Sequence, residues 1–370
     1  MTITSSRISR RALPLLALST VAGAAACSTG GRDGTGASGR DGGGGEPSAE
    51  DLLPAAEGAT RYPLTLTTWL GESVLEQRPS RIATVGFSVN TDMLQALGAT
   101  PVYTITEDVD YAWRDQEWFR SIEVIDTATR KDPINVEGIA AAVPDLIIAM
   151  NSLTDEGEYE RLRDIAPVLD VATAEELGDQ FDWRAAQLLV GTALDLESAA
   201  QDVIEEADGA ISDVAAQHPE FEGLTITIGT DYGGQYELEY YTTTGGTAET
   251  IMSELGFAPN PLAENFLDDA VVSAENTSLL DADALVVIYA DEETREAREG
   301  LALFQDLPPV SEGRYVSLTN SAEDPTALVT PDGRETANPT WVLRRGASAV
   351  SLPWAVDVVA NQWLADLDLR

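Results

Sequence analysis

The sequence predicts an α/β protein of two similar lobes, each built on a central sheet, joined by a single long helix. Three observations carry this prediction. Short apolar strands alternate with helical segments along the body of the chain, which favours parallel sheets covered by helices. Two sequence patterns each occur twice, in the same order, and one long helical segment over residues 196–218 lies between the copies.

The first 26 residues are typical of a signal peptide. Three arginines near the start precede an apolar stretch over 12–26, which is too short to span a membrane as a helix. The stretch ends in "AGAAAC" at Cys27, the only cysteine of the chain. It resembles a bacterial lipoprotein lipobox, although Ala24 stands where leucine is preferred, and we expect lipidation of Cys27. The Arg10–Arg11 pair leaves Sec and twin-arginine export both open.

The segment over 27–60 is rich in Gly and Ser and predicts a flexible linker. The body over 61–370 is long enough for one large or two medium domains. The formal net charge of −41 predicts a surface that repels nucleic acid. We therefore expect a lipid-anchored monomer on the outer face of the cytoplasmic membrane, with no nucleic-acid partner.

The N-terminal lobe is assigned to 61–195. An apolar run over 81–85 predicts a buried strand, and a helical period over 91–97 ends at Gly98, a residue typical of a helix C-terminus. The run over 100–105 predicts the next strand. These elements form the first α/β unit of the lobe.

The C-terminal lobe is assigned to 219–370, and it repeats this plan. The run over 224–230 predicts a strand, and "ETIMSELGFAP" echoes "DMLQALGATP" of the first lobe. A second repeat places Glu137 eight residues before Asp145, and Glu275 eight residues before Asp283, each time ahead of an apolar strand. Two repeats in the same order indicate lobes of the same topology.

The segment over 196–218 predicts a rigid connecting helix. Asp195 is expected to cap its start and Pro219 follows its end. Gly209 weakens the helix by about 1 kcal/mol relative to alanine without breaking it. An apolar stripe at helical spacing is formed by Ala199, Val203, Ile204, Ala207, Ile211 and Val214.

Four further motifs, in order over some 300 residues, resemble the class III substrate-binding lipoproteins of ABC importers, which serve iron–siderophore, haem and vitamin B12 uptake. They are "RYPLTL" (61–66), "VEGIAAAVPDLIIA" (136–149), "YERLRDIAPVL" (159–169) and "SAVSLPWAVDVV" (348–359). The match is closest to the iron–siderophore branch. The resemblance implies two Rossmann-like lobes, a ferric siderophore as ligand, and an importer made of a permease dimer and its ATPase as partner.

The resemblance also gives the repeated glutamates a function. In the family, each lobe presents a surface glutamate to an arginine pocket of the permease dimer, and these positions match Glu137 and Glu275. One matching anion per lobe suits a two-fold partner, because charge complementarity fixes the register. An ordinary glutamate in the first turn of a helix, favourable to the helix dipole, would show the same pattern.

The ligand is expected in the cleft between the lobes, at loops that follow strand ends. Aromatic faces and a few cations suit a bulky chelate whose iron is already coordinated. The residues expected there are Phe87, Ser88, Trp113, Arg114, Asn151, Tyr232, Tyr240, Tyr241, Tyr289, Arg344 and Arg345. For each aromatic residue, packing in the core is an equally good interpretation.

Arg344 and Arg345 stand where the family often has small or apolar residues. They could attract an anionic chelate or pair with surface carboxylates, and we favour the pairing. The acidic background favours a neutral or cationic ferric hydroxamate over a triply charged catecholate complex. The sequence leaves the siderophore class, the affinity and the identity of the permease open.

Other functions are less favoured by the sequence. A transition-metal site needs several N or S ligands, and the chain has one histidine, His218, and the single cysteine. No nucleophile elbow or phosphate loop is present, so we expect no enzyme and no cofactor besides the lipid. Haem or a corrinoid remains an alternative cargo, since Tyr232, Tyr240 or Tyr241 could ligate haem iron. A sensor or adhesion lipoprotein of the same fold also remains open.

Overall fold

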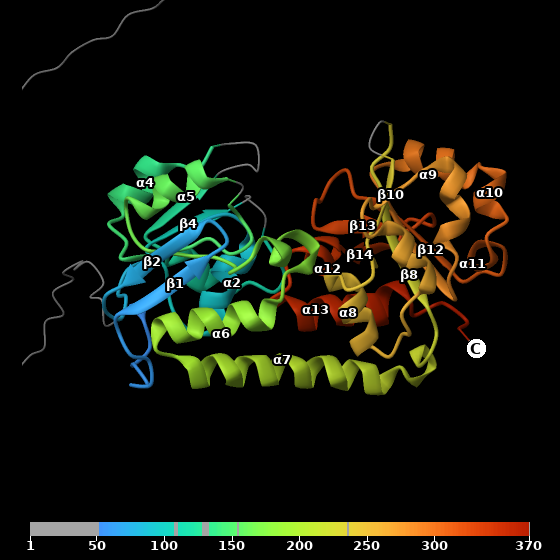
Figure 1. The fold of residues 1–370 in the computed structure, drawn as a ribbon. Helices are drawn as coiled ribbons and strands as arrows, with labels where there is room; N and C mark the ends of the chain where they lie inside the picture. The colour runs from blue at the N-terminus through green and yellow to red at the C-terminus, as the bar shows by residue number, and fades with distance from the viewer. Residues whose placement is uncertain (1–51, 107–109, 128–132, 154, 235–236, 370) are drawn as a thin grey trace, which may run out of the picture. The chain divides into compact units, whose positions relative to one another are not determined.

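The computed structural model describes residues 52–106, 110–127, 133–153, 155–234 and 237–369. These residues belong to a single compact unit that holds two sheets of the α/β kind, with one long helix between the lobes (Figure 1). The predicted fold class is therefore confirmed. The predicted signal peptide, Cys27 and residues 28–51 lie outside the described residues. None of the helices in the described part of the chain combines the length and hydropathy that a membrane span requires.

The N-terminal lobe is built on a parallel sheet of order β5-β4-β3-β6-β7. Its strands are β3 (Ile82–Thr84), β4 (Tyr103–Thr106), β5 (Val124–Thr127), β6 (Leu146–Ile148) and β7 (Val168–Leu169). An antiparallel hairpin of β1 (Leu64–Thr68) and β2 (Gly71–Leu75) lies beside β7. The helical segments are α2 (Ser88–Ala96), α3 (Gln116–Arg120), α4 (Val136–Ala141), α5 (Glu156–Arg163), η1 (Ala174–Glu176), η2 (Gly178–Gln180) and α6 (Trp183–Leu194).

The C-terminal lobe has a mixed sheet of order β10-β9-β8-β11-β12-β13-β14, in which β8, β11 and β12 are parallel and the outer strands are antiparallel. Its strands are β8 (Ile226–Asp231), β9 (Leu238–Tyr240), β10 (Val271–Val272), β11 (Ala284–Tyr289), β12 (Tyr315–Asn320), β13 (Ala327–Val329) and β14 (Glu335–Ala337). Its helical segments are η3 (Pro219–Phe221), α8 (Thr247–Glu254), η4 (Pro261–Phe266), η5 (Ala274–Leu280), α9 (Glu292–Glu299), α10 (Ala302–Gln305), α11 (Pro308–Ser311), α12 (Thr340–Arg344), α13 (Ser351–Val358) and η6 (Val359–Trp363).

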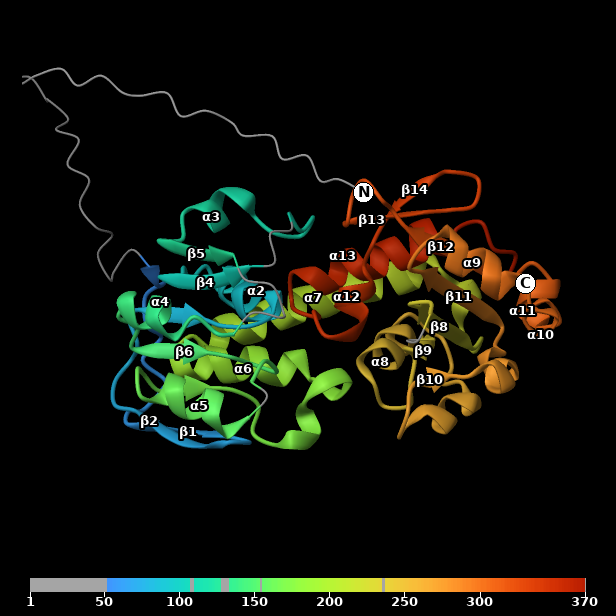
Figure 2. The same ribbon diagram turned by 90° about the horizontal axis from the view of Figure 1, so that it is seen from above.

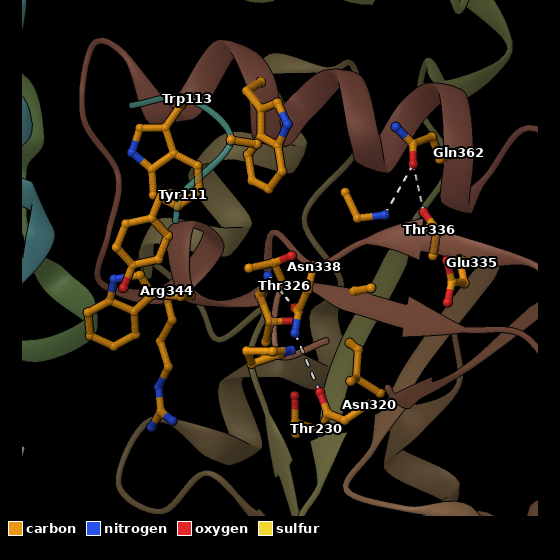
Figure 3. Close-up of a pocket in the computed structure, with 18 of the residues that line it drawn as sticks. Tyr111, Trp113, Thr230, Asn320, Thr326, Glu335, Thr336, Asn338, Arg344 and Gln362 are labelled. Atoms are coloured by element: carbon orange, nitrogen blue, oxygen red, sulfur yellow. Dashed lines mark hydrogen bonds between the residues drawn. The ribbon is translucent and has the colours of Figure 1, made fainter. Parts of the chain in front are cut away.

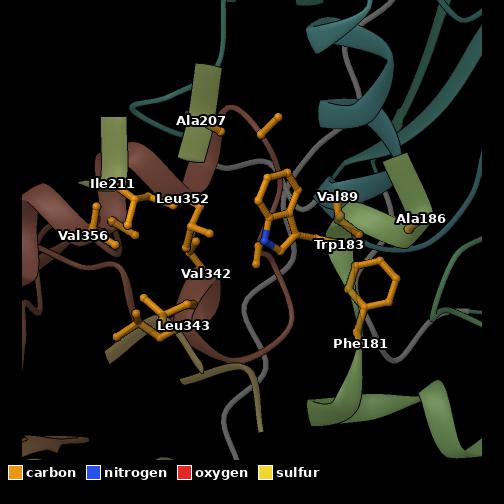
Figure 4. Close-up of a cluster of buried hydrophobic side chains, with 14 of the residues drawn as sticks. Val89, Phe181, Trp183, Ala186, Ala207, Ile211, Val342, Leu343, Leu352 and Val356 are labelled. Atoms are coloured by element: carbon orange, nitrogen blue, oxygen red, sulfur yellow. The ribbon is translucent and has the colours of Figure 1, made fainter. Parts of the chain in front are cut away.

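The long helix predicted over 196–218 is α7 (Glu197–Gln217), and both α6 and α13 pack against it (Figure 1). Seen from above, α13 lies over α7 (Figure 2). The buried stripe of α7 is formed by Ala200, Ile204, Ala207, Ile211 and Val214, while Ala199 and Val203, which were predicted to belong to it, are only half-buried. The stripe belongs to a single hydrophobic cluster, which joins the N-terminal lobe, α7 and the α12–α13 region (Figure 4). Packing in this shared core holds α7 against helices of both lobes.

The start of α7 differs from the prediction. Asp195 does not cap this helix; it ends α6 in the left-handed conformation, with φ of 55°. Its carboxylate accepts hydrogen bonds from the backbone N–H groups of Gly58, Ala59 and Thr60. The first turn of α7 is instead bound by Glu57, whose carboxylate accepts from the N–H groups of Ser198 and Ala199 at 2.8 and 2.9 Å. The acceptor comes from far along the chain, which sequence spacing does not reveal.

The same contacts correct the predicted linker. We expected a flexible coil through residue 60, but residues 52–60 pack on the N-terminal lobe. Leu52 and Leu53 are buried at 7% and 9% exposure, and backbone bonds tie Glu57 to the end of α6. This segment packs on the lobe because the two leucine side chains are buried there and the backbone N–H groups of residues 58–60 donate to the Asp195 carboxylate. The folded body therefore includes residues 52–60.

Each sequence repeat corresponds to a structural feature that occurs once in each lobe: a glycine that ends a helix, and an aspartate that binds the residue ahead of a neighbouring strand. Gly98 and Gly256 follow helices α2 and α8 with φ of 66° and 103°, a conformation that glycine adopts without strain. The Asp145 carboxylate accepts from the N–H and hydroxyl of Ser80 ahead of β3. Asp283 binds the N–H and hydroxyl of Thr225 ahead of β8 in the same way. Each aspartate thus ties two adjacent parallel strands at their starts.

Candidate functional site

A pocket of about 660 Å³ lies where a loop of the N-terminal lobe meets the sheet and the last helices of the C-terminal lobe (Figure 3). The N-terminal lobe contributes the loop over 111–113. The C-terminal lobe contributes the ends of β8, β11 and β12, the β13–β14 hairpin, and helices α12, α13 and η6. The lining is Tyr111, Ala112, Trp113, Thr230, Tyr232, Tyr241, Ile288, Asn320, Pro325, Thr326, Ala327, Glu335, Thr336, Ala337, Asn338, Thr340, Trp341, Arg344, Arg345, Trp354 and Gln362.

Aromatic rings form one side of this pocket. Tyr111 and Trp113 are stacked, with ring centroids 4.5 Å apart, and Trp113 lies 4.9 Å from Trp354 of α13. Trp341 of α12 lies 4.9 Å from Phe87, which directly precedes α2. The Trp113–Trp354 and Phe87–Trp341 contacts each join a ring of the N-terminal lobe to a ring of the C-terminal lobe, so both lobes contribute to this side of the pocket. Such rings offer large, rigid faces to a bulky ligand.

The loop over 111–113 is held by a buried ion pair. Arg114 and Asp92 of α2 lie 3.3 Å apart, with side chains only 2% and 1% exposed. The same carboxylate accepts a hydrogen bond from the Trp113 indole N–H at 2.9 Å. The guanidinium also lies over the rings of Tyr111 and Phe119. Arg114, which we expected to contact the ligand, is not among the residues that line the pocket; its charge is paired with Asp92 inside the lobe, where it positions the loop.

Arg344 and Arg345 do line the pocket, but each is paired with carboxylates. Arg344 contacts Asp179 at 3.2 Å and Glu239 at 2.8 Å, and Arg345 contacts Asp179 at 3.0 Å. The Arg344 guanidinium also lies 4.9 Å from the ring centroid of Tyr241. Burial lowers the pKa of Arg344, but the neighbouring phenols and carboxylates outweigh this and raise it overall. Asp179 lies in η2 and the arginines lie in and after α12, so these pairs also tie the lobes together.

Two tyrosines expected at the site line the pocket. The hydroxyls of Tyr232 and Tyr241 are hydrogen-bonded to each other. Burial, together with the Tyr241 phenol, raises the pKa of Tyr232. Its hydroxyl therefore stays protonated near neutral pH and acts as a hydrogen-bonding group rather than as a phenolate.

Two other tyrosines that we expected at the site, Tyr240 and Tyr289, belong to the core of the C-terminal lobe and are not among the residues that line the pocket. Tyr240 is 1% exposed and stacks on Phe266 at 4.3 Å. Tyr289 is fully buried, and its hydroxyl pairs with that of Tyr315 at 2.7 Å. Along β9 and β11 these side chains point into the hydrophobic layer, because alternate strand residues face opposite sides of the sheet.

Three predicted residues of the N-terminal lobe lie beside the pocket without lining it. Asn151, with φ of 55°, binds the N–H and carbonyl of Gly178 through its amide. Ser88 is buried and accepts a hydrogen bond from the Trp341 indole at 3.4 Å. Phe87 packs against the same indole. These three residues hold the segments that surround the site and are not among its lining residues.

A polar wall of the pocket, formed by β12, the β13–β14 hairpin and η6, was not predicted from the sequence (Figure 3). Thr336 donates to the Gln362 amide at 2.8 Å, and the side-chain amides of Asn338 and Asn320 are paired at 3.4 Å. The hairpin turns at "TPDGR", a sequence typical of a tight turn, so a signal for the hairpin existed. No signal indicated that it would face the site.

The two repeated glutamates are both exposed. Glu137 lies in the first turn of α4, and Glu275 lies in the first turn of η5. Each precedes by eight residues the aspartate that ties its lobe's central strands, so the two occupy corresponding places in the two lobes. Within the described ranges, no group of three or more His, Cys, Asp or Glu side chains is arranged to hold a metal ion.

Comparison with known proteins is consistent with this architecture. The model of a family described as periplasmic binding protein matches residues 84–320. The Fe(3+)-citrate-binding protein YfmC of Bacillus subtilis is 28% identical over 221 residues, which are 59% of this chain. The chain spans 65% of the length of that relative.

Solved structures share the fold at lower identity. The PiaA protein of Streptococcus pneumoniae TIGR4 in complex with ferrichrome has a TM-score of 0.63 at 20% identity, covering 80% of this chain and 96% of that one. SirA of Staphylococcus aureus complexed with staphyloferrin B has a TM-score of 0.61 at 18% identity, covering 83% and 100%. A periplasmic solute-binding protein of Mycobacterium smegmatis has a TM-score of 0.62 at 19% identity, covering 80% and 96%.

The matched family is one of binding proteins and not of enzymes, which confirms the expectation that the chain is not an enzyme. The resemblance read from the sequence motifs is confirmed as well. The chain belongs to the periplasmic binding protein family, with the class III architecture of two α/β lobes joined by one long helix.

Proposed function

We propose that this protein captures a ferric siderophore outside the cytoplasmic membrane and delivers it to an ABC importer, while a lipid on Cys27 anchors it to the membrane. The observation that carries the proposal is the pocket of about 660 Å³ lined by both lobes. Its volume falls in the range of small-molecule sites, about 300–1,000 Å³.

The chemistry of the lining supports a preformed chelate as ligand. A ferric siderophore fills the coordination sphere of its iron with its own oxygens, so the protein needs to supply surface and hydrogen bonds. The pocket offers the rings of Trp113, Trp341 and Trp354, together with amides and hydroxyls on the opposite wall. The rings pack on apolar parts of the ligand, and the polar groups fix its orientation.

Tryptophan fluorescence tests the proposal directly, because three tryptophans line the pocket. The purified chain is titrated with ferric hydroxamates, ferric catecholates, haem and cobalamin, each beside its iron- or metal-free form. Saturable quenching by a ferric chelate and not by the iron-free ligand is expected. Binding of haem or cobalamin alone would assign a different cargo, and silence from all ligands would overturn the proposal.

A pair of variants localises the binding. Trp113→Ala removes a ring from the pocket wall, and we expect affinity to fall at least about tenfold, a loss typical of a buried aromatic contact. Trp69→Phe is the matched control, since Trp69 lies in the same lobe outside the pocket, bonded to Asp170. Equal affinities in the two variants would place the ligand elsewhere.

Ferric citrate is a second candidate ligand. The Bacillus subtilis relative is named for that ligand, and two arginines line the pocket of this chain. Arginine is well suited to binding carboxylates, but a citrate complex would have to compete with the carboxylates of Asp179 and Glu239 that already pair with these arginines. Ferric citrate therefore belongs in the same titration.

We further propose that Glu137 and Glu275 dock the protein on the permease dimer. Both are exposed, and they occupy corresponding positions in the two lobes. In cells, the double variant Glu137→Arg/Glu275→Arg should lose uptake of labelled iron chelate while retaining ligand affinity. The control is Glu72→Arg/Glu206→Arg, which reverses two exposed charges on β2 and α7. Normal uptake by the first variant would refute docking at these residues.

A further inference from the structure

We infer that the pocket selects a ferric chelate without net negative charge, of the trihydroxamate class, and discriminates against anionic catecholate and citrate complexes. The inference rests on the proposed function and names the substrate class of the same site. It follows from how the charged and the neutral polar side chains of the pocket are already paired.

The charges at the pocket leave no excess of positive charge for an anion. The cations that line it are Arg344 and Arg345, and they share the carboxylates of Asp179 and Glu239. Glu335, an exposed residue of β14, adds a further negative charge to the lining. Two positive and three negative side chains thus surround the site, within a chain of formal net charge −41.

An anionic ligand could use Arg344 only by displacing its partners. The guanidinium is about a quarter exposed, and it is bound by one carboxylate from each lobe. Displacing Asp179 would leave that carboxylate near the incoming anion and would also break a contact between the lobes. Because like charges in a partly buried site repel, the existing pairs oppose the binding of a polyanion.

The neutral polar groups are instead arranged for a neutral ligand. The amides of Asn320, Asn338 and Gln362 are each fixed by a hydrogen bond within the wall. An amide carries two donors and two acceptor lone pairs, so each retains capacity for a ligand after these bonds are made. Side chains held in this way bind with little loss of conformational entropy.

The charge of the chelate decides between the siderophore classes. Three hydroxamates, each a monoanion, neutralise Fe³⁺, and the amide-rich scaffolds of such siderophores present further neutral hydrogen-bonding groups. Three catecholates, each a dianion, leave a triply negative complex, and ferric citrate is also anionic. The neutral complex is the one that avoids the pocket carboxylates.

The test compares three chelates on the full chain purified in mild detergent, by tryptophan quenching. Ferrichrome serves as the neutral trihydroxamate, ferric enterobactin as the tricatecholate, and ferric citrate as the carboxylate complex. We expect ferrichrome to bind at least about tenfold more tightly than either anionic complex. Binding of the tricatecholate or of ferric citrate as tight as that of ferrichrome, or tighter, would overturn the inference and leave the proposed function standing.

Two variants test the cause. Glu239→Gln frees Arg344 from one carboxylate, and Glu335→Gln removes a lining charge without touching the arginine pairs. Each should narrow the affinity ratio between ferrichrome and ferric enterobactin by about threefold to tenfold. Glu264→Gln, an exposed position on η4 outside the pocket, is the control and should leave the ratio unchanged.

The outcomes separate the two proposals. If none of the ferric chelates binds, the proposed function fails and the inference fails with it. If ferrichrome is preferred but neither Glu239→Gln nor Glu335→Gln narrows the ratio beyond the Glu264→Gln control, charge selection at the pocket is refuted while ferric-siderophore binding stands.

Discussion

The buried pair of Asp92 and Arg114 allows the sharpest prediction about how the fold serves the site. The variant Asp92→Ala removes a carboxylate that is 1% exposed and leaves the Arg114 guanidinium, 2% exposed, without its partner. It also removes the acceptor of the Trp113 indole N–H. Stability and ligand binding should fall together, because Trp113 lines the pocket.

The magnitude follows from the burial of both charges. Breaking a buried ion pair by removing one partner costs about 3–5 kcal/mol, because the remaining charge is uncompensated. The double variant Asp92→Leu/Arg114→Met removes both charges and restores some packing. It loses the contacts of the guanidinium with the Tyr111 and Phe119 rings, each worth about 0.5–1 kcal/mol. We therefore expect the double variant to be about 2 kcal/mol more stable than the single variant.

Urea unfolding followed by circular dichroism measures both variants, and fluorescence titration with the bound chelate measures affinity. In Asp92→Ala we expect affinity to fall at least about tenfold, since the loop over 111–113 loses its anchor. Phe119→Leu, which changes a neighbour of Arg114 without removing a charge, serves as the control.

Either of two results would contradict these roles of the Asp92–Arg114 pair. A double variant that is less stable than Asp92→Ala would show that the uncompensated guanidinium is not the source of the destabilisation. Unchanged ligand affinity in a clearly destabilised Asp92→Ala would show that the pair supports the lobe without positioning the pocket loop.

Three further predictions concern the body of the protein. Burial raises the pKa of Asp170 to about 6, so the folded chain binds the Asp170 proton more tightly than the unfolded chain; protonated Asp170 therefore stabilises the fold fully below about pH 4, and this contribution is lost as the pH rises through about 6. Relative to Asp170→Asn, the free energy of unfolding of the wild type should increase by about 1 kcal/mol when the pH is lowered from about 7 to about 5. Equal changes in the two proteins would contradict this prediction. Leu53→Ala should lower the free energy of unfolding by about 2 kcal/mol, because the segment over 52–60 packs on the N-terminal lobe. The control is Leu303→Ala: Leu303 is 62% exposed, so the free energy of unfolding should change by no more than about 0.5 kcal/mol. Equal effects of the two variants would indicate that the segment over 52–60 is a flexible linker, as the sequence predicted. Asp145→Ala and Asp283→Ala should each lower the free energy of unfolding in urea by about 1–2 kcal/mol. The loss should be larger for Asp145→Ala, because the Asp145 carboxylate also accepts a hydrogen bond from the N–H of Arg81. The reverse order would be inconsistent with this geometry.

Much of the site lay beyond the reach of sequence analysis, for reasons that differ among the residues. Arg114 sits beside Trp113 in the sequence, yet one is consumed by a buried carboxylate and the other faces the pocket. Tyr240 ends β9 and Tyr241 directly follows it; only the second lines the pocket, because successive side chains of an extended chain point to opposite sides. Sequence identifies such residue types but does not fix which side each one faces without the register of the sheet.

The two α/β lobes, the long helix between them and the places of the two repeats could be predicted from the order of the amino acids, because hydrophobic periodicity and glycine helix ends are local and recur in each lobe. Which distant charges meet depends on tertiary contacts. Asp179 pairs with Arg344 and Arg345, and Glu57 binds the start of α7, across more than a hundred residues of chain. Partners so far apart are brought together by the packing of the whole core, and the charge that the pocket offers a ligand depends on that packing.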